Sequence, residues 1–505
     1  MLVLGVDLGT SSVKVSVIDA ASQKRLASAS WPETEAEIVS TQRGWAEQSP
    51  EIWWEHVQQA IRKCHEAGNY HPTDISAIGI AYQMHGLVLV NSALNSIRKA
   101  IIWCDSRAVQ TGEEGLSELG AEYCQQCLLN SPGNFTASKL AWVRKNEPFV
   151  FQRIQHFMLP GDFIAMKLTG ELTTTASALS EGIFWDFRNA RVSEEVLQWA
   201  GWSGERLPKI TPVFADHGRL QSSVAQALSL RPGIPVSYKA GDQPNNALAL
   251  QVMEPGEVAV NAGTSGVIYA ITDQLQADYQ SRVNSFAHVN YNEFQQRIGV
   301  LLCINGAGIF NRWARQLLGN NFTYQQINQL AEAAPAGSQG LMAFPFGNGA
   351  ERMLNNLSPG AGFVGIDLNL HGTSHWLRAV QEGIAFAFRY GMDIMLENGL
   401  DIHLLRAGNA NLFQSSIFTQ TLADICGYPI ELRETDGSVG AAIGAALGLG
   451  YYQHASDAAA LNPVLQKVEP LYIDEVAENY MRWKTVLQQS LHKLEPASSL
   501  TLSES

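Results

Sequence analysis

The sequence predicts an α/β fold in which two domains flank a ligand-binding cleft, and three observations lead to this prediction. The chain has 505 residues, which is too long for one hydrophobic core and indicates two domains of roughly 200–250 residues. Each half contains an apolar strand, a Gly-Thr-Ser tip and a second strand, with the tips at residues 9–11 and 263–265. Between these tips, Asp242 stands where a short strand ends and an apolar helix begins, a usual place for a ligand in an open α/β sheet.

The composition is that of a packed globular enzyme. Hydrophobic residues make up 46% of the chain and charged residues 16%, which excludes a disordered protein. The net charge is −14 with only 34 Lys and Arg residues, so we expect no nucleic-acid partner. An acidic protein can still bind polyphosphate where backbone amides and a divalent cation supply the positive field.

Cysteine use and hydropathy predict a reduced, soluble, cytoplasmic protein without a membrane partner. Cys124 and Cys127 lack the second pair or the nearby histidine that a zinc site needs, so we expect them to share one packed helix face. Asp7 interrupts the first apolar run and no basic region precedes it, which argues against a signal peptide. The longest small-apolar run, residues 439–449, is too short to span a membrane.

The first half begins with the hairpin at residues 2–17 and continues with a strand near residues 26–31. Ser49 followed by Pro50 predicts the start of a helix. Four residues recur there at helical spacing: Ile52, His56, Ala60 and Cys64. Residues 75–81 predict a buried strand that ends in the polar segment 82–86.

Another apolar strand, at residues 101–103, ends before Asp105 and Arg107. These two residues could form a structural ion pair, which is the commoner case, or line a ligand site. Similarly, Asp242 alone could be an ordinary helix cap. The residues by themselves leave both alternatives open.

The second half contains a helix after Asn305, with Phe310, Trp313 and Leu317 on one face. The Gly-x-Gly at its start lacks the third glycine of a dinucleotide-binding fingerprint. A long helix near Ser374 directs four residues inward, namely Leu377, Val380, Ile384 and Phe388. Residues 437–446 predict a closely packed helix.

The tail predicts a further helix with an apolar stripe formed by Val476, Tyr480, Trp483, Leu487, Leu491 and Leu494. We expect it to dock on the body of the protein, with the first domain as a candidate partner. The serine-rich residues after Pro496 are expected to be mobile.

The paired hairpins carry the functional signal. Glycine permits close backbone approach, and exposed N–H groups and hydroxyls can donate to phosphate oxygens. One Gly-Thr-Ser is an ordinary turn, but two copies between apolar strands, the first preceded by Asp7, predict a polyphosphate site.

Residues 7–11 and 262–266 resemble the two phosphate loops of the actin-like ATPase superfamily, which implies two ribonuclease H-like domains around the cleft. Residues 241–243 resemble the catalytic segment of its carbohydrate-kinase branch, the FGGY family. Residues 83–86 closely resemble the sugar-binding segment of the xylulokinase members of that family. The resemblance extends from the first strand to about Gly450, and we expect the domains to cover residues 1–246 and 247–505.

The resemblance implies ATP and Mg²⁺, with Asp7 at the metal and Asp242 as the catalytic residue. The residues that it implies for nucleotide binding are Gly9, Thr10, Ser11, Ser12, Lys14, Gly263, Thr264, Ser265, Gly306, Gly408 and Asn409. Those that it implies for sugar binding are Gln83, Met84, His85, Asp105, Asp242 and Gln243, with Trp45 and Gln48 as weaker candidates.

Three segments depart from the family pattern. In the adenosine loop at residues 406–411, Ala407 and Asn409 replace two of three usual glycines. In the turn at residues 347–352, which resembles the Gly-Glu-Arg turn of the family, Met353 and Leu354 follow where Thr-Pro is common. Residues 175–180 lack the usual acid, so we assign them no role.

The implied activity is an ATP-dependent sugar kinase that phosphorylates the terminal hydroxyl of a ketopentose, with D-xylulose as first choice. A kinase for another polyol or sugar acid (L-ribulose, glycerol or gluconate) stays open, because it would differ only in the sugar pocket. A non-transferring actin-like ATPase is the second alternative, and it would need neither Asp242 nor the Met84-His85 pair. The sequence leaves a homodimer open.

Overall fold

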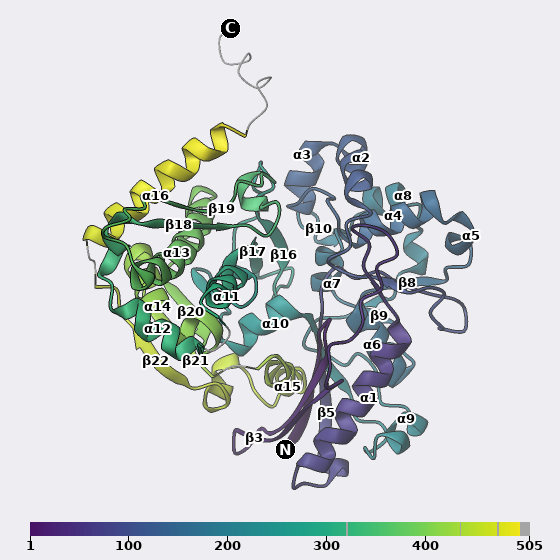
Figure 1. Ribbon diagram of the computed structural model, residues 1–505. Coiled ribbons are helices and arrows are strands. Elements are labelled where there is room, and N and C mark those ends of the chain that lie inside the picture. The colour runs from purple at the N-terminus through teal and green to yellow at the C-terminus, as the bar shows by residue number, and fades with distance from the viewer. Residues whose placement is uncertain (320–321, 435, 472–473, 495–505) are drawn as a thin grey trace.

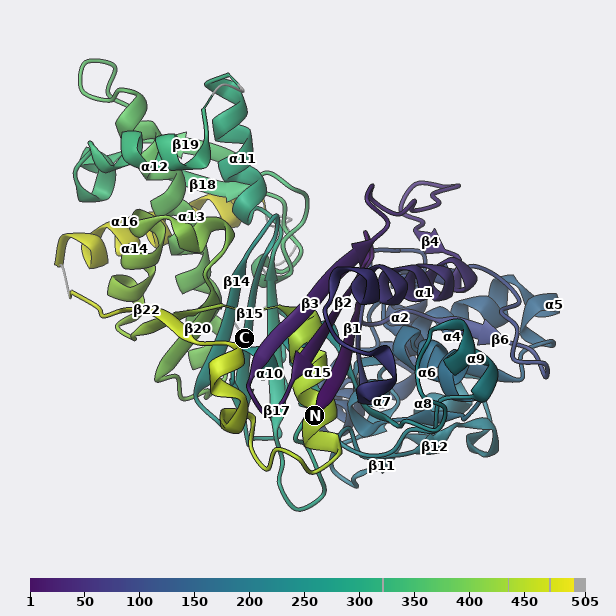
Figure 2. The same ribbon diagram turned by 90° about the horizontal axis from the view of Figure 1, so that it is seen from below.

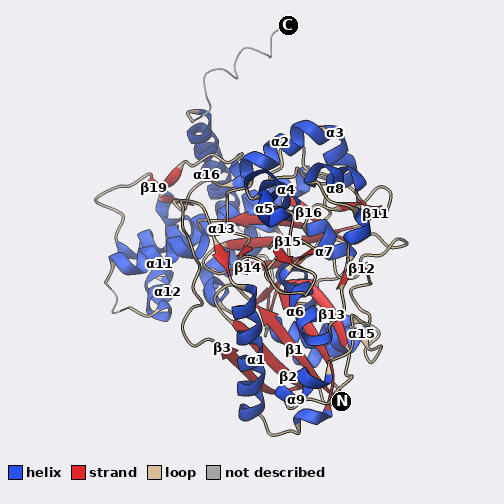
Figure 3. Cartoon of the chain, turned by 90° about the vertical axis from the view of Figure 1, so that its right-hand side faces the viewer, coloured by secondary structure: helices blue, strands red, loops and turns tan. Residues whose placement is uncertain are grey.

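The computed structural model describes residues 1–319, 322–434, 436–471 and 474–494 of the chain, which form two lobes that lie side by side (Figure 1). Each lobe is built on one large sheet. In Figure 3 the strands lie inside and the helices surround them. The tail residues after Pro496, which were expected to be mobile, lie outside the described residues.

The first lobe contains a five-stranded sheet in the order β13-β5-β1-β2-β3. Its strands are β1 (Leu2–Leu8), β2 (Val13–Asp19), β3 (Lys24–Trp31), β5 (Ile75–Tyr82) and β13 (Val236–Gly241). Strands β13, β5 and β1 are parallel, whereas β1, β2 and β3 are antiparallel. Because helices cover both faces, β5 and β13 are buried along almost their whole length, as their continuous apolar runs require.

The second lobe repeats this plan in a seven-stranded sheet, in the order β16-β17-β15-β14-β20-β21-β22. Its strands are β14 (Glu257–Ala262), β15 (Gly266–Thr272), β16 (Asn284–Ala287), β17 (Ile298–Ile304), β20 (Leu404–Gly408), β21 (Ile430–Arg433) and β22 (Val464–Val468). Strands β14, β20 and β21 are parallel, and β14, β15 and β17 are antiparallel, so they correspond to β1, β5, β13 and to β1, β2, β3. The structure therefore has the expected α/β fold.

The helices of the first lobe are α1 (Pro50–Ala67), α2 (Val109–Leu119), α3 (Ala121–Tyr123), α4 (Thr136–Asn146), α5 (Pro148–Phe151), α6 (Pro160–Thr169), α7 (Ala176–Glu181), α8 (Glu194–Ala200) and α9 (Ser222–Ala227). Helix α10 (Asp242–Ala249) leads to the second lobe. The later helices are α11 (Ala307–Leu317), α12 (Tyr324–Glu332), α13 (Thr373–Glu397), α14 (Ser416–Cys426), α15 (Gly437–Gly448) and α16 (Asp474–His492).

Short strands complete the structure as separate two-stranded pairs. They are β4 (Glu47–Gln48) with β7 (Ala100–Ile101), β6 (Val88–Val90) with β8 (His156–Met158), β9 (Thr173–Thr174) with β12 (Lys209–Ile210), β10 (Trp185–Asp186) with β11 (Arg191–Val192), and β18 (Met342–Phe346) with β19 (Gly360–Val364).

Helix α15 belongs to the second half of the sequence but packs on the sheet of the first lobe, on the face opposite α1 (Figures 1 and 2). The backbone of α15 contacts the backbone of the strands directly there. A Cβ atom added to Gly5 would lie 1.9 Å from the Ser438 carbonyl oxygen, and one added to Gly79 would lie 1.9 Å from that of Ala441. Only glycine allows so close an approach, so these strand glycines serve the packing.

The tail helix α16 packs on its own lobe, against α13 and α14, and the expectation that it returns to the first domain is wrong. The Trp483 indole N–H donates to the Ala343 carbonyl oxygen over 2.8 Å, and the Tyr480 hydroxyl donates to Asp393. The apolar stripe of α16 packs against this lobe, where Phe344 stacks on Trp483 with 5.2 Å between the ring centres. The helix of the second half that packs on the first lobe is α15. The division at residue 246 stays a prediction, and α10 spans it.

Two expected helix faces need correction, while a third is confirmed. In α1, Ile52 is 48% exposed, and the buried face runs through Trp53, Val57 and Ile61 together with Ala60 and Cys64. In α11, Phe310 is buried but Trp313 and Leu317 are exposed. Spacing alone could not choose between adjacent stripes that share residues. In α13, the four residues expected to point inward are all buried.

Cys124 and Cys127 are free thiols buried within a helical turn, as expected. The described residues include no group of three or more His, Cys, Asp or Glu side chains that could hold a metal ion. Within the same described residues, no helix combines the length and the apolar character needed to cross a membrane.

We predict that Gly79→Val destabilises the protein by at least about 1–3 kcal/mol, because the side chain would collide with the α15 backbone. Thermal or urea unfolding measures the loss. Gly362→Ala is the control, since a Cβ atom there meets no other atom within 4 Å. Equal stability of the Gly79 variant and wild type would contradict the packing argument.

Candidate functional site

Three polar segments leave the first sheet at the same edge. In the register of the parallel strands, Leu8 pairs with Tyr82 and Tyr82 with Gly241. The Gly-Thr-Ser tip, the segment 83–86 and Asp242 therefore follow three neighbouring strands directly. The carboxyl edge of parallel strands is where open α/β sheets bind ligands.

Asp242 is the first residue of α10 and is half-buried. Burial, followed by the negative charge of Asp7, raises the pKa of Asp242 to about 7, while hydrogen bonds from the backbone and side chain of Gln243 act in the opposite direction. A carboxylate with this pKa can exchange a proton near neutral pH. The structure thus brings the candidate base, Asp7 and Gln243 together.

Asp7 lies near the end of β1 and shares this acidic environment. Burial raises the pKa of Asp7 to about 6, the charge of Asp436 adds to the rise, and Lys14 opposes it. The Lys14 ammonium lies 2.5 Å from the Asp436 carboxylate. Asp436 also caps α15 by accepting a 3.0 Å hydrogen bond from the Ser438 N–H. Lys14 therefore links the first hairpin to α15.

The tip of the first hairpin is held by side chains from other segments. The Gly9 N–H donates to the Ser12 carbonyl oxygen over 3.1 Å. The Thr10 hydroxyl donates to the Gln83 amide oxygen over 3.1 Å and accepts from the Trp103 indole over 2.9 Å. Gln83 is buried, so its amide supports the tip, while Ser11 stays exposed. Sequence reasoning did not foresee Trp103 here.

The tip of the second hairpin is joined to the start of α11. The carbonyl oxygens of Gly263 and Thr264 accept hydrogen bonds of 3.0 and 2.9 Å from the N–H groups of Gly308 and Ile309. Ser265 completes this tip before β15. Gly306 serves packing, because a Cβ atom there would lie 1.8 Å from the Pro345 carbonyl oxygen.

A cavity of about 1210 Å³ opens beside this second tip. Gly263, Thr264 and Asn409 line it, and Asn409 follows the end of β20 at Gly408. Its other walls come from α11, α12, α14 and the segment that precedes α14, together with positions on α13, β21 and β22. The cavity is large enough for a nucleoside.

Several residues that line this cavity were missed by sequence reasoning, among them Asn311, Gln325, Asn328, Gln329 and Arg378. On α12 the polar residues recur at helical spacing, which also describes a solvated helix face. That spacing was the only signal, and it does not separate a cavity wall from solvent.

Met84 and His85 stand beside Asp242. A Cβ atom on Gly241 would lie 2.6 Å from Met84 Cγ, so the glycine makes room for this methionine. The His85 Nδ1 lies 3.0 Å from the Glu181 carbonyl oxygen. Because a carbonyl oxygen only accepts, Nδ1 carries the proton and Nε2 keeps a free lone pair. Burial lowers the pKa of His85 to about 3, which keeps the ring neutral.

The environment of His85 is built by both lobes. Its ring contacts Phe135 at 4.9 Å and Phe286 of β16 at 5.2 Å between ring centres. The Lys139 ammonium donates to the His85 carbonyl oxygen over 2.8 Å. The ring is thereby fixed in place at the junction of the lobes.

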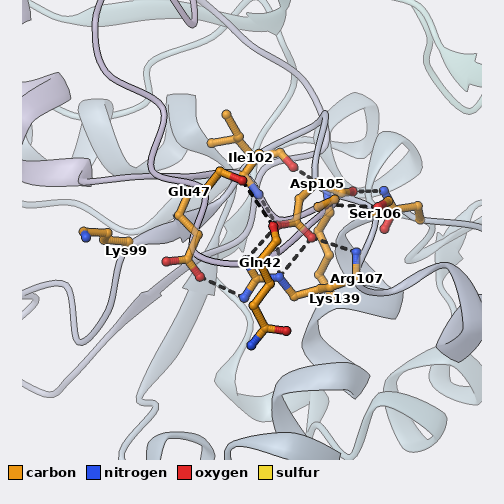
Figure 4. A network of polar contacts seen from close by, with 12 residues as sticks. Gln42, Glu47, Lys99, Ile102, Asp105, Ser106, Arg107 and Lys139 are labelled. Atoms are coloured by element: carbon orange, nitrogen blue, oxygen red, sulfur yellow. Dashed lines mark hydrogen bonds and ion pairs between the residues drawn. The ribbon is translucent and has the colours of Figure 1, made fainter. Parts of the chain in front are cut away.

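Asp105 lies in a closed polar network with Arg107 (Figure 4). Both side chains are fully enclosed, and the Arg107 Nη2 lies 2.7 Å from the Asp105 carboxylate. The Ala46 N–H donates to the same carboxylate over 2.5 Å. Arg107 also stacks over the Trp45 ring at 3.7 Å. These contacts favour the structural ion pair over a contact between Asp105 and substrate.

The unassigned segment 175–180 joins the two lobes. The Ser177 hydroxyl donates to the Ala287 carbonyl oxygen over 2.7 Å, and the Ala287 N–H donates to the Ser180 hydroxyl over 2.9 Å. The next residue, Glu181, has a buried carboxyl group without a hydrogen-bond partner among the described residues. Burial raises the pKa of Glu181, with Asp242 adding to the rise.

Comparison with protein families matches nearly all of both lobes. Residues 2–249 match the N-terminal domain of the FGGY family of carbohydrate kinases, and residues 258–451 match its C-terminal domain.

Individual relatives give the same picture. A xylulose kinase of Escherichia coli is 30% identical over 452 residues, which is 88% of each chain. A solved structure described as a xyloylose kinase from Brucella ovis has a TM-score of 0.87 at 27% identity and covers 98% of this chain and all of its own. A gluconate kinase structure from Lactobacillus acidophilus, 22% identical with a TM-score of 0.88, covers 98% of this chain and 99% of its own, and shares the fold.

The raised pKa of Asp242 predicts a pH-dependent cost in stability. The folded protein binds this proton more tightly than the unfolded chain, whose value is 3.8, so stability falls as pH rises from about 4 to about 7. We expect Asp242→Asn to raise the Tm at about pH 8 but not at about pH 4, by an amount equivalent to roughly 1–3 kcal/mol.

Thermal melts over this pH range test the prediction. Asp273→Asn, at an exposed position, makes the same change of charge and should show no such trend. A Tm gain of the Asp242 variant that is independent of pH would contradict the electrostatic explanation.

Proposed function

The chain belongs to the FGGY family of carbohydrate kinases, and from this premise we propose that it transfers the γ-phosphoryl group of ATP to the terminal hydroxyl of D-xylulose, forming D-xylulose 5-phosphate. Membership makes the protein a phosphotransferase with an alcohol group as acceptor and ATP as its substrate. The choice of D-xylulose is supported by relatives that are xylulose kinases, including those of Escherichia coli and Bacillus subtilis. The Met84-His85 pair beside Asp242 is consistent with it.

The observation that carries the mechanism is the position of Asp242, at the end of β13 with its pKa near 7. In the proposed reaction, the Asp242 carboxylate accepts the proton of the sugar hydroxyl as that oxygen attacks the γ-phosphorus. Phosphoryl transfer depends mostly on positioning and on charge stabilisation. The position of the base therefore matters more than its strength.

His85 and Met84 would orient the sugar. The free lone pair on His85 Nε2 can accept a hydrogen bond from a sugar hydroxyl, since Nδ1 is committed to the Glu181 carbonyl oxygen. The Met84 side chain offers an apolar surface for carbon atoms. Gln243 holds the Asp242 carboxylate in its direction through hydrogen bonds.

The two Gly-Thr-Ser tips would hold the phosphates. Backbone N–H groups at both tips and the Thr264 hydroxyl would supply donors from opposite lobes. The Thr10 hydroxyl would first exchange its hydrogen bond to Gln83 for one to phosphate. The cavity beside Thr264 would take the nucleoside, with Gly408 and Asn409 at its edge. Phosphates bound to both tips would draw the lobes together and exclude water from the reaction.

Asp7 fits a Mg²⁺ ion. Its carboxylate oxygens are of the type that Mg²⁺ prefers, and the pKa of Asp7, raised to about 6 by burial and Asp436, indicates a site that favours added positive charge. Since three acidic or histidine ligands do not converge in the described residues, Asp7 would share the ion with water and phosphate oxygens. The ion would offset phosphate charge. A homodimer and a cytoplasmic location also remain proposals.

We expect Asp242→Asn to lower kcat by about two to four powers of ten, because the base is lost, while ATP binding stays nearly unchanged. A coupled assay of ADP release gives kcat, and nucleotide titration gives the Kd. Asp273→Asn is the matched control. Wild-type turnover by the Asp242 variant would exclude the base role.

We also expect kcat/KM for the sugar to rise with pH and to level off above about 7, because the base must be deprotonated and the pKa of Asp242 in the free protein is about 7. A pH profile of ADP release at sugar concentrations well below KM measures this. A flat profile between about pH 5 and pH 8 would argue against it.

The choice of sugar is tested by ADP release over a panel of D-xylulose, L-ribulose, glycerol and gluconate. We expect the highest kcat/KM with D-xylulose and little ADP release without sugar. A preference for another acceptor would overturn the assignment of D-xylulose but not the assignment as a sugar kinase. Equal ADP release with and without sugar would instead support a non-transferring ATPase.

A further inference from the structure

Arg352 lies in a turn of the second lobe that is anchored by its neighbour, Glu351. The buried Glu351 carboxylate accepts hydrogen bonds of 2.9 and 3.0 Å from the N–H groups of Asn305 and Gly306. These two residues connect β17 to α11. The turn is therefore fixed to the segment that also supports the second Gly-Thr-Ser tip.

The guanidinium group of Arg352 has few partners for a mostly buried charge. It donates one hydrogen bond, to the Asn284 side-chain oxygen, and it forms no ion pair with any described residue. Burial lowers the pKa of Arg352. A guanidinium has five N–H donors, and only part of this set is used by Asn284. Arg352 is not among the residues with a buried, unpaired nitrogen, so its remaining donors stay accessible to a ligand.

Arg352 faces the same junction as the candidate sugar residues. Its guanidinium lies 5.9 Å from the centre of the Phe135 ring, which in turn contacts His85. Burial is the main cause of the lowered pKa of His85, and the positive charges of Lys139 and Arg352 add to it. Burial raises the pKa of the Cys303 thiol to about 11, Arg352 opposes the rise and Asp242 adds to it, so both charged groups lie near this residue. Arg352 thus lies across the junction from His85 and Asp242.

We propose that Arg352 is a sugar-recognition residue that donates hydrogen bonds from the second lobe to the carbonyl end of the bound ketose. The inference rests on the proposed function. Asp242 takes the terminal hydroxyl, and in a ketopentose the carbonyl lies toward the opposite end. A carbonyl oxygen only accepts and a guanidinium only donates, so the two groups match. His85 Nε2, which only accepts, is left for a hydroxyl.

This assignment gives the second lobe a direct part in choosing the sugar. The first lobe alone offers Met84, His85 and Asp242, none of which requires a carbonyl group. An acceptor that also engages Arg352 bridges the two lobes. Sugar binding would then favour the arrangement in which the phosphate tips approach each other.

The test compares wild type with Arg352→Gln, Arg352→Ala and Arg352→Lys, using D-xylulose and its reduced form, xylitol. We expect the KM for D-xylulose to rise about 10- to 100-fold in the Gln and Ala variants, because each loses hydrogen bonds that a charged group donates to the sugar. The KM for ATP should change less than about twofold, and the effect on xylitol should be smaller than that on D-xylulose. The Lys variant, which keeps the charge, should lose less.

Free guanidinium ion at non-denaturing concentration supplies a readout that a structural role would not move. It should lower the KM for D-xylulose in the Ala variant and leave wild type unchanged. Arg297→Gln is the matched control, because Arg297 pairs with the exposed Glu254 in the same lobe. Melting curves show whether each variant is folded, and the Lys variant keeps the comparison informative if the others are not.

An unchanged KM for D-xylulose in folded variants would overturn the inference, as would an equal loss for ATP without guanidinium rescue. Failure of the wild type to phosphorylate D-xylulose while it phosphorylates another acceptor would overturn the proposed function instead. A loss of equal size for D-xylulose and xylitol would place Arg352 at a hydroxyl and overturn the carbonyl assignment.

Discussion

The close packing of α15 on the first sheet is the contact on which the rest of the structure depends. Gly5 and Gly79 leave room for the Ser438 and Ala441 carbonyl oxygens, and Gly448 of the helix meets Ser237 of β13 in the same way. The N-terminus of the helix then meets the candidate site, since a Cβ atom on Gly437 would lie 2.1 Å from Asp7 Oδ2. A helix from the second half thereby joins the lobes and encloses the first carboxylate.

This enclosure explains the electrostatics of the site. Burial raises the pKa of Asp7 to about 6 and that of Asp242 to about 7. The charge of Asp436 adds to the rise for Asp7, and the charge of Asp7 adds to the rise for Asp242. Across the junction, Arg352 carries a positive charge without a carboxylate partner in the described residues. Uncompensated charges of both signs reduce stability, and proteins retain them where a ligand completes the site. A phosphate, a cation and a polar sugar would complete this one.

The repeated sheet plan accounts for the symmetry of the two Gly-Thr-Ser tips. In each lobe the tip joins the first two strands of the antiparallel part, and two further parallel strands extend the sheet beside it. The lobes touch through α15 and through the bonds between α7 and β16. The candidate sugar residues lie next to this second connection, because the backbone carbonyl oxygen of Glu181 in α7 accepts a hydrogen bond from His85 Nδ1.

The sequence by itself determined the features that depend on local order. Apolar runs, glycine turns and helix starts within a few residues set the α/β class and both Gly-Thr-Ser tips. They also set the change from strand to helix at Asp242. The family followed from the same motifs. Local order could not choose between neighbouring stripes on α1 and α11, because the two choices share residues.

Only the tertiary structure decided which distant segments meet. In the folded chain, α15 rather than the tail helix packs on the first lobe. Asp105 forms an ion pair with Arg107, and Arg352 lies at the junction opposite His85. The tertiary structure also raised the pKa of Asp242, since burial depends on residues that lie far apart in the chain. The physical reason is the same in each case: desolvation and long-range packing are properties of the assembled interior, and no short stretch of sequence contains them.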